Sequence, residues 1–285
     1  MRFTGLKYLQ LLACLGLFAC GSAERYDVVI VGGGASGTAA GLQAARMGAR
    51  TLIVEEFDWL GGKLTSAGVS ATDGNYRLRG GIWDEFRTEL ARHYGCDSAL
   101  ITGWVSNVMF EPSVGDSIFK RLVAREPNLT VWYRSAAETA ERGKDVWRLG
   151  VRRDGRLRQV EAGVLVDATE LGDVARMAGV PYDVGMDSSA VTHEDIAPAE
   201  ANGIVQDLTY VAVLKDYGRD VTIPRPDGYD PSLFACCCVN DLCIAPKEPH
   251  RMWSREMMIT YGKLPDGKYM INWPIEGNDY YVDMI

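Results

Sequence analysis

Three glycines near the start of the chain have the spacing that binds a diphosphate. Gly32, Gly34 and Gly37 form a GxGxxG pattern directly after the apolar run YDVVIV at 26–31. In such a pattern the first glycine makes a tight turn, the second lets the backbone approach a diphosphate, and the third allows close packing of helix on strand. Backbone amides and the positive end of the following helix then hold the anion.

An acidic pair follows at the distance that this motif requires. The apolar run at 51–54 ends at Glu55, near the position about 20 residues on where a carboxylate accepts hydrogen bonds from the adenosine ribose. Glu56 adds a second negative charge, which disfavours a 2′-phosphate and therefore NADP. A glycine-rich turn without ligand is the alternative. Because strand, glycines, helix, strand and acid follow in register, we predict a dinucleotide site that includes Ala35 and Ser36.

The elements that position these residues are short and regular. Residues 26–31 are a continuous apolar run, as in a parallel strand that is buried on both faces. Residues 36–47 are rich in alanine and predict a helix, with Gly41 where that helix packs closely on the sheet. Gly48 is placed to end the helix. The run at 51–54 predicts a second strand.

Further motifs favour FAD over NAD. A second glycine doublet, Gly61 and Gly62, comes soon after the acidic pair, and Lys63 and Thr65 continue it. Three short strands are expected at 136–141, 146–152 and 157–161, after one at 130–133, and we expect Gly143 and Gly155 to supply the positive φ of tight hairpins. A separate apolar strand at 164–169 then runs through ELGD into a helix. A dehydrogenase domain that binds NAD would continue with βαβ units instead.

Taken together, these motifs resemble the FAD-dependent oxidoreductase family with a glutathione-reductase-like FAD domain. Three further stretches, SAGVSATDGNYRLRGGIWDEF, GYDPSLF and LPDGKYMINWPIEGND, resemble members encoded beside polysaccharide-degrading enzymes. The resemblance runs from Tyr26 to Ile285. It implies hydride transfer through flavin and cofactor contacts at Gly32, Gly34, Gly37, Glu55, Gly62 and Asp173. Lys63 replaces the arginine that often follows the doublet, so a cation is kept but its bidentate fork is lost.

The predicted fold class is α/β. Residues 21–180 are expected to form a Rossmann-like FAD-binding domain with a parallel sheet and a β-meander. Residues 181–285 are expected to begin a mixed α+β substrate domain, with a strand at 204–213 and another from Tyr280. For Asp173 an equally good interpretation is an acid that offsets the dipole in the first turn of a helix.

The second half contains no residue with an evident catalytic role. Its aromatic side chains either line a flavin-facing or sugar-stacking pocket or pack in a core. They are Trp253, Tyr261, Tyr269, Trp273, Tyr280 and Tyr281. His193 and His250 lie in the half expected to hold substrate, and His93 lies outside it. Surface or structural roles are the simpler interpretation of the histidines, so the catalytic base is unassigned.

The first 20 residues form a targeting segment. Arg2 and Lys7 precede an apolar stretch at 8–19 that is shorter than the roughly 20 residues of a membrane-spanning helix. This arrangement is typical of a secretory signal. The end, LFAC, resembles a bacterial lipoprotein signal, which implies cleavage before Cys20 and acylation of its thiol. An ordinary cleaved signal and an N-terminal element of the fold are the alternatives.

The composition and net charge of the chain limit the classes of molecule that it can bind. Of 285 residues, 47% are apolar and 24% are charged, which is an ordinary globular balance. The formal charge of −8 argues against nucleic acid, whose binders usually carry a basic surplus. Past Cys20, five cysteines remain: Cys96, Cys236, Cys237, Cys238 and Cys243. Small apolar residues of a strand or turn, a disulfide, or a redox or metal site all fit the run at 236–238, which has no CxxC spacing.

The sequence therefore predicts a lipid-anchored envelope oxidoreductase that binds FAD, with a small organic or carbohydrate-derived substrate and no metal. The rival from another class is a non-catalytic envelope lipoprotein that keeps the fold and binds glycans or protein partners. An NAD-binding dehydrogenase is a third alternative. The chain stops after a strand-like segment, without the returning flavin-binding segment expected from the resemblance, so we also expect a C-terminally truncated gene product.

Overall fold

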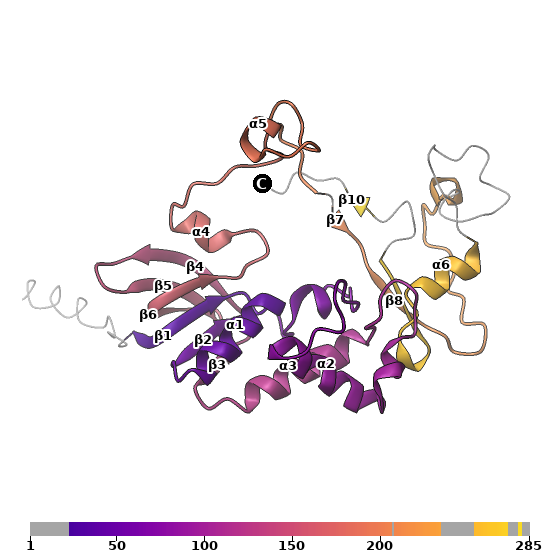
Figure 1. The fold of residues 1–285 in the computed structure, drawn as a ribbon, viewed down its shortest axis with the longest axis horizontal. Helices are drawn as coiled ribbons and strands as arrows, with labels where there is room; N and C mark the ends of the chain where they lie inside the picture. Colours follow the sequence, from indigo (N-terminus) through magenta and orange to yellow (C-terminus); the bar gives the residue numbers. More distant parts are fainter. Residues whose placement is uncertain (1–22, 207, 235–253, 273–278, 281–285) are drawn as a thin grey trace, which may run out of the picture.

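The computed structural model describes residues 23–206, 208–234, 254–272 and 279–280. Its centre is a sheet in the order β3-β2-β1-β6-β5-β4, of which the first four strands run parallel and the last three antiparallel (Figure 1). The strands are β1 (Glu24–Val31), β2 (Thr51–Val54), β3 (Leu129–Trp132), β4 (Ser135–Arg142), β5 (Trp147–Arg153) and β6 (Arg156–Asp167). The predicted parallel sheet and β-meander are thereby confirmed.

The register brings three strand ends to one edge of the sheet. Val31 at the end of β1 pairs with Val54 of β2 on one side and with Asp167 of β6 on the other. All three strands run in the same direction, so the loops that leave them meet at their carboxyl ends. Ligands of open α/β sheets bind at this edge.

The crossover helix α1 (Ala35–Arg46) follows β1 and leads into β2. It packs closely, since a Cβ on Gly41 would lie 2.6 Å from Cδ1 of Ile53. Gly48 lies just after the end of α1, has a φ of 92°, and donates its N–H to the carbonyl of Ala45. The predicted helix, its close packing and its end are confirmed. Two longer helices follow, α2 (Gly81–Tyr94) and α3 (Pro112–Ala124).

Two apolar cores flank the sheet. One contains Val29, Leu52 and Trp132 of the parallel strands, together with Leu149 and Val160 of the meander. The other contains Leu42 of α1 and the buried faces of α2 and α3, where the rings of Phe86 and Phe119 stack with centroids 4.3 Å apart. Burial on both faces explains why β2 reads as an uninterrupted apolar run.

Two predictions about the meander are wrong. Residues 157–161 and 164–169 were expected as separate strands, but β6 is continuous because Ala162 pairs with Tyr26 on one side and with Trp147 on the other. Gly143 does not adopt the positive φ expected of it. It allows close approach instead, since its Cβ would lie 2.9 Å from the Val146 carbonyl oxygen. Gly155, with φ of 72°, does form the predicted hairpin turn.

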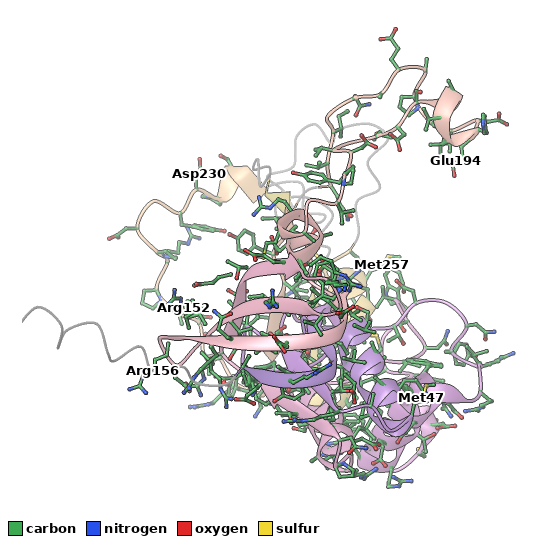
Figure 2. The ribbon with its side chains drawn as sticks, turned by 90° about the vertical axis from the view of Figure 1, so that its left-hand side faces the viewer. Met47, Arg152, Arg156, Glu194, Asp230 and Met257 are labelled. Atoms are coloured by element: carbon green, nitrogen blue, oxygen red, sulfur yellow. The ribbon has the colours of Figure 1, made fainter. Side chains whose placement is uncertain are left out.

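The later part of the chain has short elements and long extended segments. The segment carrying Glu194 projects away from the sheet (Figure 2). The strand expected at 204–213 is wrong as one element, because β7 and β8 pair with different partners, β10 and β9. The remaining elements are α4 (Asp173–Met177), α5 (Ser189–Thr192), β7 (Leu208–Thr209), β8 (Ala212–Lys215), α6 (Arg255–Tyr261), β9 (Lys268–Ile271) and β10 (Asp279–Tyr280). The described residues also form 3-10 helices, two in the first half at Gly62–Leu64 and Asp97–Leu100, and two in the later part at Pro231–Phe234 and Pro265–Gly267.

Several predicted features lie outside the described residues. They are the targeting segment with Cys20, the cysteines at 236–238 and 243, His250, Trp253, Trp273, Tyr281 and the end of the chain. Within the described residues, the helices are all too short or too polar to cross a bilayer. The same residues contain no cluster of three or more His, Cys, Asp or Glu able to hold a metal ion.

Candidate cofactor site

The glycine loop after β1 is closed by main-chain hydrogen bonds. Gly32, with φ of 98°, donates its N–H to the Val54 carbonyl at 2.8 Å. The carbonyl of Gly33 accepts the N–H of Gly61 and the hydroxyl of Thr38, each at 2.8 Å. These bonds join β1, β2, α1 and the second glycine doublet. Thr38 was not predicted, because a buried threonine inside a helix has no distinctive sequence signal.

The three motif glycines differ in what surrounds them. A Cβ on Gly37 would lie 1.9 Å from the Gly32 carbonyl oxygen, and a Cβ on Gly32 would lie 2.2 Å from the Ala168 carbonyl oxygen. Both glycines are therefore required by packing. Gly34 has φ of −58°, and the nearest atom to its Cβ position is a carboxylate oxygen of Glu170 at 3.7 Å. The fold does not require glycine there, so Gly34 leaves room for something outside the protein chain.

Glu55 is buried beneath the loop. One carboxylate oxygen accepts the N–H of Gly33 at 2.6 Å, and the other accepts the N–H of Phe57 at 2.7 Å. Burial raises the pKa of Glu55 above its ordinary value, the two N–H groups oppose that shift, and the charges of Glu56 and Glu170 add to it. The structure therefore shows that Glu55 fixes the glycine loop, a role that the sequence did not predict. The predicted contact of Glu55 with the adenosine ribose stays a prediction.

The second doublet lies against the first motif. Gly34 and Gly61 form a parallel bridge, and a Cβ on Gly62 would lie 3.0 Å from the Gly34 Cα. Gly61 and Gly62 have φ of 104° and 51°, which glycine tolerates best. The hydroxyl of Thr65 closes the turn by donating to the Leu60 carbonyl at 2.6 Å. Two glycine turns distant in sequence thus form one cradle.

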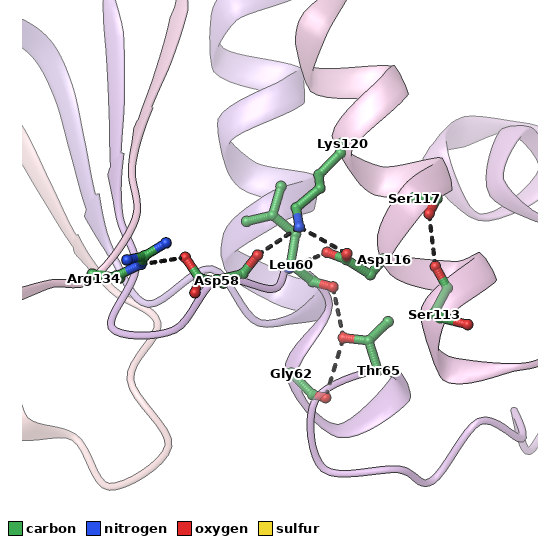
Figure 3. Close-up of polar contacts among 9 residues, drawn as sticks. All are labelled: Asp58, Leu60, Gly62, Thr65, Ser113, Asp116, Ser117, Lys120 and Arg134. Atoms are coloured by element: carbon green, nitrogen blue, oxygen red, sulfur yellow. Dashed lines mark hydrogen bonds and ion pairs between the residues drawn. The ribbon is translucent and has the colours of Figure 1, made fainter.

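Helix α3 holds this second turn in place (Figure 3). The Asp116 carboxylate accepts the N–H of Leu60 at 2.8 Å, and its other oxygen pairs with Lys120 at 2.8 Å. Lys120 also donates to the Asp58 carbonyl at 2.5 Å, and the Asp58 side chain pairs with Arg134 at 2.7 Å. Asp116 and Lys120 were missed, because their spacing on a helix predicts only a surface ion pair.

The loop after β6 is organised by Asp167. Its carboxylate accepts the N–H and hydroxyl of Thr169 at 2.9 and 2.7 Å, and the N–H of Ala175 at 2.7 Å. Asp173 is the first residue of α4, is partly exposed, and lies 4.0 Å from Arg176. This position fits the helix-dipole interpretation, and the cofactor contact of Asp173 stays a prediction. Glu170 lies closer to the cradle, 3.2 Å from the Cβ position of Gly62.

The remaining predicted residues are sequence neighbours of the motif glycines or of Glu55. Ala35 and Ser36 begin α1, and Ser36 is exposed. Glu56 and Lys63 are exposed, and they precede and follow the buried Leu60 in the sequence. The structure therefore brings both glycine motifs and their flanking residues together at the carboxyl edge of the sheet.

The described histidines and Tyr261 have surface or core positions. His93 and His193 are exposed, in agreement with a surface role. Tyr261 is fully buried, and its hydroxyl donates to Asn272 at 2.8 Å, which is the core role. Cys96 is a free, exposed thiol, and its hydrogen bond with Ser98 lowers the pKa of that thiol.

The comparison that decides the family covers most of the chain. A model of the family described as FAD dependent oxidoreductase matches residues 27–285. The chain belongs to this family. Its members use FAD, and the match extends through both the cradle and the later part of the chain.

Curated relatives match the FAD oxidoreductase chain over short stretches. The NADH:fumarate oxidoreductase of Klebsiella pneumoniae (strain 342) is 44% identical over 63 residues, which are 21% of this chain and 7% of that protein. The vinyl phenol reductase of Lactiplantibacillus plantarum (strain ATCC BAA-793 / NCIMB 8826 / WCFS1) is 33% identical over 108 residues, 30% of this chain and 20% of that protein. The chain thus spans a fifth or less of the length of these two relatives.

Solved structures are similar over somewhat more of the chain. A myxobacterial chondrochloren halogenase, described as FAD-dependent, has 15% identity and a TM-score of 0.44, with 57% of this chain and 41% of that one covered. A geranylgeranyl bacteriochlorophyll reductase-like protein from Thermoplasma acidophilum has 18% identity and a TM-score of 0.40, with 55% and 43% covered.

The residues present fit FAD. The space beside Gly34 and Gly62 lies at the start of α1, where backbone N–H groups and the helix dipole favour a diphosphate. The glycines would hold the diphosphate, and Glu55 fixes the first glycine loop. Ser36 and Lys63 are exposed and follow the two motifs in the sequence. When bound, FAD supplies a two-electron acceptor for hydride transfer.

Proposed function

We propose that this chain is an FAD-dependent oxidoreductase of the bacterial cell envelope that acts on a small organic or carbohydrate-derived substrate. The observation that carries the proposal is the shared cradle of Gly34 and Gly62, since the fold leaves open space at Gly34 and a helix start faces that space. The protein's part in the reaction is to hold the cofactor rigidly and to place a substrate beside it. Residues 181–285 are proposed as the substrate domain.

Turnover is tested by reduction of the bound flavin. The purified chain is incubated without oxygen with panels of alcohols, organic acids and sugar-derived compounds, and the visible absorbance is followed. Bleaching by one class, reversed on admitting an electron acceptor, supports the oxidoreductase. A chain that retains little FAD, is not bleached by any class and is retained on immobilised glycans supports the non-catalytic lipoprotein instead.

Anchoring is proposed on the signal-like segment that ends at Cys20. Acylation of Cys20 would hold the folded body close to the membrane, because few residues separate it from β1. The test is fractionation of cells that express the wild type or Cys20→Ser, with labelled palmitate. Label and membrane retention that are lost in Cys20→Ser support the anchor. An unlabelled wild type contradicts it.

A further inference from the structure

A cavity lies next to the second glycine turn. Its volume is about 380 Å³, within the range of small-molecule sites. One wall is the segment from Thr65 to Gly68, which follows the glycine doublet directly. The others are the start of α3 and strand β8 with the adjoining Lys268. The cavity therefore joins the cofactor-binding half of the chain to the later half.

The cavity has an apolar lining on two sides. Trp59 contributes an aromatic ring from the segment before the doublet. Val211, Val213 and Leu214 contribute aliphatic surface from the region of β8. These side chains suit the apolar or ring-shaped body of a small organic molecule. They do not by themselves select its polar group.

The charged residues of the lining do select a polar group. The register of β8 and β9 places Lys215 directly opposite Lys268, and both residues line the cavity. Like charges directly opposite on neighbouring strands repel. Among the ionisable residues of the lining, Glu111 is the single carboxylate against these two cations. The lining thus carries a surplus positive charge, although the whole chain has a formal charge of −8.

Glu111 is committed to one of the two lysines. It forms an ion pair with Lys268, and its own side chain is 10% exposed. Its backbone N–H donates to the Tyr94 hydroxyl at 3.0 Å, which fixes the residue at the start of α3. Lys215 makes no ion pair within the described part of the chain, and its ammonium lies 5.3 Å from the centroid of the Tyr217 ring. Lys215 is therefore the cation left for a ligand.

We propose that this cavity binds a small organic monoanion, a carboxylate on an apolar or ring-shaped body, with Lys215 as the residue that binds the carboxylate. The apolar body packs against Trp59 and the side chains of β8. Because Thr65–Gly68 line the cavity and follow the cofactor turn, the anion is the substrate class of this oxidoreductase. That last step rests on the proposed function, whereas binding of the anion does not.

The test uses benzoate as the anionic probe and benzyl alcohol as its uncharged counterpart, with the full chain and calorimetry. Lys215→Gln is expected to weaken benzoate binding by about tenfold, because a charge-assisted hydrogen bond is lost. Benzyl alcohol binding is expected to stay unchanged, and Lys215→Arg is expected to restore most of the benzoate affinity. Lys144→Gln is the matched control, since Lys144 is an exposed lysine of the β4–β5 turn, and it should leave both probes unaffected.

Two results would overturn the anion site. One is equal benzoate affinity in the wild type and Lys215→Gln, when unfolding midpoints show that both are folded. The other is benzyl alcohol binding as tightly as benzoate. If benzoate binding depends on Lys215 but the chain carries no flavin, the oxidoreductase proposal fails and the anion site stands. If the chain carries flavin but does not bind benzoate, the anion site fails alone.

Discussion

The carboxylate of Glu55 accepts the backbone N–H of Gly33 at 2.6 Å, which ties the end of β2 to the glycine loop of β1. Its second oxygen accepts the N–H of Phe57, so one buried side chain fixes both loops. A residue predicted to contact the ribose is thus also a positioning residue for the diphosphate cradle. Its effects on stability and on cofactor binding are coupled.

Removal of this carboxylate leaves a buried N–H group without an acceptor. We expect Glu55→Ala to lower the free energy of unfolding by about 1–3 kcal/mol and to weaken FAD binding. Urea unfolding and FAD titration measure the two effects. Glu56→Gln is the control for the stability measurement, because Glu56 is exposed and its carboxylate does not hold the glycine loop. Equal stability of Glu55→Ala and the wild type would show that the contact does not hold the loop.

The raised pKa of Glu55 predicts a pH dependence with a definite sign. Because the folded chain holds the Glu55 proton more tightly than the unfolded chain, the stability that this group contributes is full below its ordinary pKa of 4.5. It falls as pH rises through the folded value. The free energy of unfolding of the wild type, minus that of Glu55→Gln, should therefore decrease as pH rises above 4.5. If this difference in unfolding free energy grows as pH rises, the pKa of Glu55 is lowered in the folded chain and not raised.

The first half of the fold could be predicted because its local signals and its tertiary pairing agree. The apolar run of β2 matches a strand buried on both faces, and Gly48 ends the crossover with positive φ. The prediction of two separate strands at 157–161 and 164–169 was wrong, because nothing in the sequence around Ala162 indicates that this residue pairs with strands on both sides. The prediction of one strand at 204–213 was wrong because the strands that pair with β7 and β8 are distant in sequence, so local residue patterns do not indicate them.

The motif glycines are expected to respond differently to alanine. Gly37→Ala would place a methyl group 1.9 Å from the Gly32 carbonyl oxygen and should cost about 1–3 kcal/mol or more through overpacking. Gly34→Ala has space and an ordinary φ, and reduced freedom of the unfolded chain should leave it neutral or more stable by up to about 1 kcal/mol. Urea midpoints compare the two. Equal destabilisation would contradict the packing described for Gly37.

Asp116 is expected to control the second glycine turn from α3. Asp116→Ala removes the acceptor of the Leu60 N–H and should lower stability by about 1–3 kcal/mol, while weakening FAD binding. Asp116→Asn keeps one acceptor oxygen and should recover part of both losses. Lys120→Ala should cost less, because Lys120 is more exposed than Asp116. If Lys120→Ala lowers stability more than Asp116→Ala, the contact of Lys120 with the Asp58 carbonyl, and not Asp116, holds the turn in place.

The contact between Asp116 and Leu60 shows which site residues sequence reasoning misses. The backbone geometry of a glycine motif can be predicted from its residue types and their spacing. A carboxylate that accepts a main-chain N–H from a distant loop has the same sequence appearance as any acid on a helix. The same holds for Asp167, whose three hydrogen bonds order the loop before α4.

FAD occupancy of Gly34→Leu tests the central claim most directly, since Gly34 alone among the motif glycines has open space and an ordinary φ. Gly203→Leu is the matched control, because a Cβ there meets no atom within 4 Å and Gly203 is not among the glycines with positive φ. We predict close to equimolar FAD in the wild type and Gly203→Leu, and loss of FAD from a folded Gly34→Leu. A Gly34→Leu variant with unchanged FAD occupancy, or a folded wild type that takes up no FAD, would contradict the cradle as the cofactor site.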